Sequence, residues 1–387
     1  MKGTSTQILR SDDAQDREAW LAAWRECGRE PFAHPAYVEL FAHSQGEQAR
    51  CLVARDDSGT AIVPFILRPV SHNVQGLRSG LSDAISPYGY GGPYGTSKTL
   101  ASGVWPLASE WMHEEGVVSL FARLALNAPE PDLPDGAAVR LTADNVVVDL
   151  ALTEAEQWLR YEHKVRKNVK KALRAELSAT IRPRFADLDE FVELYHDTMS
   201  RRSASSFYFF DRTFFVAIQD GLPESYVAAE VRDATGRLVS AELVLTSDQF
   251  LYSFLGGTRE DAFPMAPNDL LKHAVIGYGR TTGRRGFVLG GGYSAGDGIF
   301  RYKRSFDPTG SVPFRTLRLI ADSPTYDRLT EAHAHEQSGA RSACIDDDFF
   351  PAYRGPAPSR SPDPEPIEVQ PSLMDSVNSN AEGPPGA

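Results

Sequence analysis

The feature that most constrains the fold is a succession of elements through which the chain passes twice. Each pass predicts helices, a β-hairpin with a polar turn, a further strand, a helix and a last strand. The two hairpin turns fall at residues 56–59 and 233–236. This order predicts an α/β fold of two similar tandem domains, each a mixed sheet flanked by helices. The two passes agree in element order and not residue by residue.

The expected domains are residues 1–150 and 151–354, and a length of 387 residues suits two domains. Residues 1–14 are polar and are predicted to be loose. After Arg354 the chain is rich in Pro, Ser and Gly, which predicts a disordered tail over 355–387.

The apolar periodicity gives the element predictions. In the first domain helices are expected at 17–27, 34–43 and 99–115, and strands at 51–54, 61–67, 117–124, 139–141 and 146–150. In the second domain helices are expected at 154–177, 188–199 and 268–282, and strands at 226–231, 238–246, 250–255, 287–289 and 312–320.

Composition excludes several classes of protein. The net charge is −12, so nucleic acid in general and DNA in particular are not expected partners, and any RNA contact must be local. Three scattered cysteines predict a reducing compartment without a disulfide framework, and no His or Cys spacing predicts a metal site. No leader and no long apolar run is found, so we expect a cytoplasmic protein without a transmembrane segment.

The stretch 284–306 combines a short apolar strand, the triple glycine Gly290, Gly291 and Gly292, and a short helix carrying Lys303. Glycines let a ligand or a second backbone come close. A lysine between Tyr302 and Phe306 is a candidate cation for a developing oxyanion. Two alternatives are a dinucleotide-binding fingerprint and a tight turn before an amphipathic helix with Lys303 extended to solvent.

The helix expected from Glu154 has an apolar face and a cationic remainder. Candidate contacts to phosphate or RNA are Lys164, Arg166, Lys167 and Lys171. The alternative is a solvated face that pairs in part with acidic neighbours.

Two other stretches are aromatic. The loop with Tyr88 and Tyr90 among glycines is a candidate cleft lining, or an ordinary glycine loop. Most of the aromatic residues of 195–215 are expected in the core.

Taken together, these stretches resemble the Fem family, which comprises FemAB-like, GNAT-fold, aminoacyl-tRNA-dependent transferases. The matching segments are SPYGYGGP at 86–93, VRKNVKKA at 165–172, TMSRRSASSFYFF at 198–210, LGGT at 255–258, PNDLL at 267–271, LGGGYSAGDGIFRYK at 289–303 and FFPAYR at 349–354.

The resemblance implies two GNAT-like domains and transfer of an acyl group from an activated ester to an amine. Tyr302 and Lys303 match the family's aromatic–lysine pair at the transfer centre, with Tyr in place of the more usual Phe. Aminoacyl-tRNA is then a co-substrate and no cofactor is expected. The implied substrate-binding residues are Tyr88, Tyr90, Asn268, Gly290, Gly291, Gly292 and Asp297.

The sequence also departs from the family. Residues 32–44 contain no Lys or Arg to grip a diphosphate, and the acidic residue expected after Gly92-Pro93 is missing. A small amine, an amino sugar or a peptide is therefore as fitting an acceptor as a cell-wall precursor. An acyl-CoA-dependent N-acyltransferase and a non-catalytic small-molecule-binding protein are the alternatives.

Overall fold

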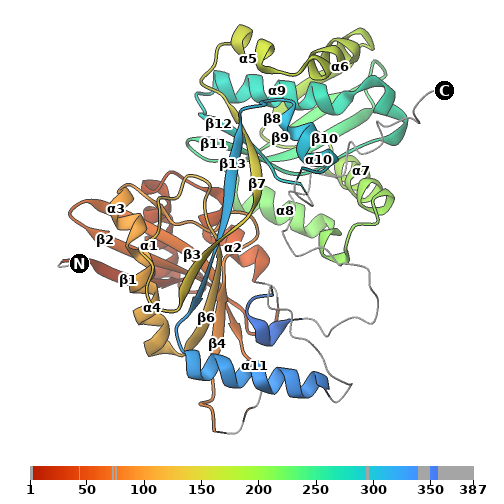
Figure 1. The fold of residues 1–387 in the computed structure, drawn as a ribbon. Coiled ribbons are helices and arrows are strands. Elements are labelled where there is room, and N and C mark those ends of the chain that lie inside the picture. Colours follow the sequence, from red (N-terminus) through yellow and green to blue (C-terminus); the bar gives the residue numbers. More distant parts are fainter. Residues whose placement is uncertain are drawn as a thin grey trace. The chain divides into compact units, whose positions relative to one another are not determined.

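The computed structural model describes residues 3–42, 44–71, 74, 76–292, 296–338 and 349–355. They fall into two compact units, one built from the chain up to Thr142 and from Phe314 on, the other from Ala143–Pro313. Figure 1 shows a sheet with packed helices in each unit. The chain passes between the units within two long strands, β7 (Ala137–Asp149) and β13 (Ser311–Ile320).

In the first unit the strand order is β1-β2-β3-β4-β6-β13, with β4 and β6 parallel and the short β5 paired to β3. Helix α4 buries Trp105 and Met112 in the core of this unit. The elements are β1 (Ser5–Arg10), α1 (Ala14–Glu26), η1 (Pro31–Ala33), α2 (Pro35–Phe41), β2 (Gln48–Asp56), β3 (Gly59–Pro69), β4 (Ser82–Ile85), β5 (Tyr94–Gly95), α3 (Lys98–Ser102), α4 (Val104–Glu115), β6 (Val117–Arg123), α11 (Ser323–Ser338) and η4 (Ala352–Arg354).

In the second unit the strand order is β8-β9-β10-β11-β12-β7, with β11 and β12 parallel. Helix α9 lies on one face of the sheet with α6 beside it, and α7 lies on the other face (Figure 1). The elements are α5 (Glu154–Arg160), α6 (His163–Arg174), β8 (Ser178–Arg182), α7 (Leu188–Arg201), η2 (Ser206–Tyr208), α8 (Arg212–Gly221), β9 (Tyr226–Arg232), β10 (Leu238–Thr246), β11 (Phe250–Thr258), η3 (Glu260–Met265), α9 (Pro267–Thr281), β12 (Gly286–Gly290) and α10 (Gly298–Arg304).

The two sheets share one topology. Each has a first strand, a hairpin, a further antiparallel strand, a parallel strand that follows a helix, and an antiparallel closing strand. The closing strands are exchanged, because β7 follows β6 in the chain but pairs with β12, whereas β13 follows β12 but pairs with β6. The compact units therefore differ from the domains expected at 1–150 and 151–354.

Other element predictions need correction. The helix expected over 154–177 is two helices, because Tyr161 is extended, with a ψ of 139°, and its side chain is buried. The helix expected over 99–115 is interrupted at Gly103, and the strands expected at 139–141 and 146–150 are the single strand β7. Residues 5–10, expected to be loose, form β1.

The α-helices and strands that were not predicted are β1, β4, β5, β8, α8 and α11. Strands β1 and β8 consist mostly of polar, exposed residues with few apolar ones, which weakens their sequence signal. The tail predicted over 355–387 lies outside the described residues except for Gly355.

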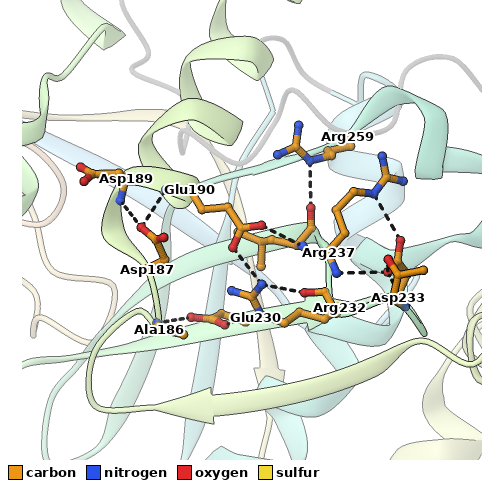
Figure 2. A network of polar contacts seen from close by, with 12 residues as sticks. Ala186, Asp187, Asp189, Glu190, Glu230, Arg232, Asp233, Arg237 and Arg259 are labelled. Carbon is orange, nitrogen blue, oxygen red and sulfur yellow. Dashed lines mark hydrogen bonds and ion pairs between the residues drawn. The ribbon is translucent and has the colours of Figure 1, made fainter.

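An ion-pair network joins the start of α7 to the β9–β10 hairpin (Figure 2). Arg232 pairs with Glu190 of α7 at 2.8 Å and with Glu230 of its own strand at 3.1 Å. Glu190 accepts the backbone N–H of Leu238 at 3.1 Å, and Glu230 accepts that of Ala186 at 2.6 Å. Because the partners of the buried Glu230 come from different elements, they fix α7 to the hairpin.

Helix α7 also packs closely on β11 through Gly257. A Cβ at this position would lie 2.6 Å from the Thr198 hydroxyl oxygen and 2.7 Å from the Leu194 carbonyl oxygen. Gly257, the second glycine of the LGGT segment, is thus required by the close approach of α7.

We predict that Gly257→Ala lowers the free energy of unfolding by about 1–3 kcal/mol, because backbone must move to make room. The control is Gly277→Ala in α9, where an added Cβ meets no atom within 4 Å. That change should raise the free energy of unfolding by up to about 1 kcal/mol, since Ala favours helix. Urea unfolding compares them, and equal stabilities would contradict the packing account.

Candidate active site

The second unit gathers polar side chains at the start of α9. Four residues of its first two turns, Asn268, Asp269, Lys272 and His273, reach different elements. Their partners lie on α10, on α6, on β10 and at the turn between α5 and α6, respectively. This end of α9 is therefore the point at which the site is assembled.

Lys272 makes a buried ion pair with Glu242 of β10. Its Nζ donates to the two carboxylate oxygens at 2.9 and 2.8 Å and to the Ser253 hydroxyl at 2.8 Å. The Lys272 and Glu242 side chains are 3% and 0% exposed, and the ammonium lies 5.4 Å from the centre of the Phe287 ring. Full hydrogen bonding offsets the cost of removing both charges from water.

Strand β11 carries a bulge where it leaves its parallel neighbour. The pairing of β11 with β12 ends at Tyr252 and Val288, and Phe254 is an extra residue opposite β10. Residues at even separation on a strand normally share a face. Here Ser253 contacts α9 whereas Gly257 contacts α7, so the bulge has reversed the alternation.

Lys303 lies next to the triple glycine. It is 2% exposed, and its Nζ donates to the Gly291 carbonyl at 2.7 Å. Gly290 has a φ of +84°, and a Cβ on Gly291 would lie 2.9 Å from the Asp144 carbonyl oxygen. The ammonium and the glycine turn are thus held as one local structure.

Asp297 caps α10 and lies beside Gly292. Its carboxylate accepts the Phe300 N–H at 2.7 Å, and a Cβ on Gly292 would collide with it. The predicted Gly291 and Gly292 therefore admit the chain's own groups, while substrate contact by these residues stays a prediction.

Tyr302 and Asn268 are also brought together. The Asn268 amide donates to the Tyr302 hydroxyl at 2.8 Å, which joins α10 to the start of α9. The Tyr302 ring meets Phe306 edge-on, and Phe306 in turn meets Tyr161. Seven predicted site residues thus lie on adjoining elements of one unit, namely Asn268, Gly290, Gly291, Gly292, Asp297, Tyr302 and Lys303.

Asp269 is a site residue that the sequence analysis did not identify. It is 3% exposed and accepts a hydrogen bond from the Asn168 amide of α6 at 3.2 Å. Burial raises the pKa of Asp269 from 3.8 to about 7, against the opposing effects of Asn168 and the Lys164 charge. The side chain can therefore exchange a proton near neutral pH.

Helix α6 carries several exposed cations. Lys164, Lys167, Lys171 and Arg174 are exposed and form no ion pair with any residue that the structure describes. Lys170 lies 5.7 Å from the centre of the Trp158 ring. A one-signed surface of this kind attracts phosphates.

Arg166 differs from the other predicted phosphate contacts. Its guanidinium donates to backbone carbonyls at the end of α5, those of Trp158, Leu159 and Tyr161. These carbonyls have no partner within their own helix, so Arg166 caps α5. A phosphate contact by Arg166, as predicted, would come in addition to this capping role.

The two loop tyrosines lie in the first unit. Tyr88 is 7% exposed and stacks on Phe41, and its carbonyl accepts the Tyr37 hydroxyl at 2.9 Å. The Tyr90 ring meets Phe32 edge-on. Both rings therefore have packing roles there, and their predicted substrate contact remains a prediction.

The loop of these tyrosines continues the pairing of the first sheet. Ser86 N–H donates to the Phe121 carbonyl at 2.8 Å, and Gly91 N–H donates to the Arg123 carbonyl at 2.6 Å. In the first unit β4 ends early, and this loop occupies the space beside the rest of β6. In the second unit the equivalent strand, β11, continues as a strand beyond its pairing with β12.

Comparison with known proteins identifies the fold. Residues 160–304 match the family model described as an acetyltransferase (GNAT) domain. The crystal structure of FemX aligns at 13% identity, with a TM-score of 0.60, over 83% of this chain and 99% of that one. Residues 160–304 are thus similar to GNAT domains, and the chain shares the fold of FemX.

Two further structures share this fold. L-PGS from Bacillus licheniformis is 12% identical, with a TM-score of 0.51, over 84% of this chain and 97% of that one. A conserved protein of unknown function from Bacteroides thetaiotaomicron VPI-5482 is 10% identical, with a TM-score of 0.50, over 81% and 100%. No curated protein matches by sequence.

The predicted α/β architecture with two GNAT-like domains is confirmed. Among the described residues no helix has the length and apolar character needed to cross a bilayer. Within the same residues, no three His, Cys, Asp or Glu side chains gather as a metal ion would require.

The raised pKa of Asp269 predicts a pH-dependent effect of Asp269→Asn on stability. Between about pH 4 and 7 the unfolded chain has lost this proton and the folded chain retains it, so wild-type stability falls as pH rises. The amide of Asp269→Asn does not ionise, so the variant does not lose stability in this way. The variant's gain over wild type should grow from near zero at pH 4 to at most about 4 kcal/mol above pH 7.

Thermal melting across this range measures the difference. Glu162→Gln removes an exposed carboxylate beside α6 and is the control, for which no such trend is expected. A gain by Asp269→Asn that stays constant with pH would contradict the assignment.

Proposed function

We propose that this chain is an aminoacyltransferase that moves an aminoacyl group from aminoacyl-tRNA to an amine. The observation that carries the proposal is the exposed cationic surface of α6, which forms no ion pair among the described residues and lies in the same compact unit as Lys303. On a protein of net charge −12, such a face suits a local contact with RNA phosphates. The donor implied by the Fem resemblance fits it.

The reaction joins the amine nitrogen to the ester carbonyl carbon. A C–N bond forms, the C–O bond to the tRNA ribose breaks, and one proton passes from the amine to the leaving ribose oxygen. The carbonyl oxygen carries negative charge in the tetrahedral intermediate, and a preorganised cation or donor lowers the barrier to that state.

Lys303 is the proposed stabiliser of this oxyanion. One ammonium N–H is engaged by the Gly291 carbonyl, which fixes the direction of the side chain. Tyr302 is held by Asn268 beside it, so the hydroxyl has a fixed position before substrate binds. The buried surroundings strengthen the interaction of the cation with developing charge.

An acyl-CoA is the alternative donor. The description of the matched family as an acetyltransferase (GNAT) domain favours it. A rise in melting temperature with CoA, and none with deacylated tRNA, would select this donor.

Lys303→Met should lower the rate of transfer about 10²- to 10³-fold, because it removes the cation while keeping much of the side chain's volume. Arg304→Met, which removes an exposed cation one residue further along α10, is the control and should retain the wild-type rate. Single-turnover transfer of a labelled aminoacyl group measures both. A wild-type rate in Lys303→Met would exclude this role for Lys303.

The double variant Lys167→Gln/Lys171→Gln should bind deacylated tRNA more weakly. It should also reduce the slope of log affinity against log salt by up to about 2, because two phosphate contacts are lost. The control Arg184→Gln/Arg212→Gln removes two cations that already pair with Asp220 and Asp189. An equal loss in the two variants would argue against a binding face on α6.

A further inference from the structure

One side-chain contact connects the cationic helix to the helix that carries the site. Asn168 lies on the inner part of α6, and its amide donates to Asp269 near the start of α9 at 3.2 Å. The adjacent residue, Asn268, donates to Tyr302 on α10. A movement of Asp269 would therefore affect α6 through Asn168. Through the adjacent Asn268 it would also affect Tyr302, the residue before Lys303.

The charged and titratable groups around Asp269 come from several elements. From α6 it faces Lys164, which favours the ionised carboxylate, and Asn168. One turn further along α9, His273 meets the Tyr161 hydroxyl at 3.1 Å, and burial lowers its pKa. Lys272 is directed away, toward Glu242 of β10. Among the described residues, Lys164 is thus the charge that acts on Asp269.

We propose that Asp269 is a positioning residue that couples polyanion binding on α6 to the transfer site, and that it takes up a proton when the polyanion binds. The identity of the polyanion as tRNA rests on the proposed function. Because Asp269 is buried and Asn168 holds it on α6, the coupling needs no large movement.

The physical basis is the charge of Lys164. A phosphate at Lys164 offsets the positive charge that favours ionised Asp269, so the neutral carboxyl becomes more stable. A neutral carboxyl still offers an oxygen to the Asn168 amide and gains a hydroxyl donor. By reciprocity, protonation of Asp269 strengthens anion binding on α6 by the same factor.

The test measures binding of an RNA minihelix that copies an acceptor stem, by fluorescence anisotropy at constant salt. Wild type should bind about three- to tenfold more tightly at about pH 6 than at about pH 8, since Asp269 gains its proton in this interval. Asp269→Asn, which resembles the neutral carboxyl, should bind at both pH values as wild type does at the lower one. Glu162→Gln removes a carboxylate at the start of the same helix and should keep the wild-type pH dependence.

A transfer assay gives the second readout. Asp269→Ala removes the partner of Asn168, and it should lower the transfer rate about tenfold at both pH values. Asp269→Asn, which keeps an acceptor oxygen, should restore that rate.

RNA binding with the same pH dependence in Asp269→Asn and wild type would overturn the inference and leave the proposed donor standing. A transfer rate in Asp269→Ala equal to that of wild type would overturn the positioning role. Failure of the wild type to bind the minihelix at either pH would overturn the proposed donor, and this inference with it.

Discussion

The buried ammonium–carboxylate pair of Lys272 and Glu242 is the interaction on which the site depends. Such a pair is stable in the interior only when its remaining hydrogen-bonding groups are satisfied, and here Ser253 completes it. It ties α9 to β10 and β11 at one level along the helix. Loss of one partner would leave an unpaired buried charge, so the start of α9 has little freedom to move.

The fixed start of α9 sets the positions of the groups around it. Asn268 holds Tyr302, and Lys303 follows Tyr302 on α10 with its ammonium bound to the glycine turn. Asp269 holds α6, the helix that carries the exposed cations. The proposed recognition of a polyanion and the proposed stabilisation of an oxyanion thus involve elements that meet at one end of one helix.

Duplication of the topology did not give two equivalent sites. In the first unit the loop from Ser86 continues hydrogen bonding to β6, and its tyrosine rings are packed with Phe41 and Phe32. In the second unit β11 remains a strand but contains a bulge. The bulge directs the Ser253 side chain toward α9. The buried polar cluster at the start of α9 therefore lies in the second unit, as does Lys303.

Local signals predicted much of this arrangement. The strand, glycine turn and helix of 286–304 were recognisable because glycines, an Asp cap and an apolar run adjoin in sequence. Long-range features were not: Glu242 and Lys272 are 30 residues apart, and Asn168 and Asp269 are 101 apart. The break at Tyr161 and the capping role of Arg166 depend on burial of that tyrosine in the folded core, and the exchange of β7 and β13 depends on pairing between the two halves of the chain.

The most direct test of the central claim compares the two donors. The protein is incubated with a radiolabelled pool of aminoacyl-tRNA and, separately, with labelled acetyl-CoA, each with a cell extract as the source of amines. Transfer of label from the tRNA pool to a small product, abolished when the pool is first treated with RNase, is the result the account predicts. Transfer of label from acetyl-CoA alone would contradict it.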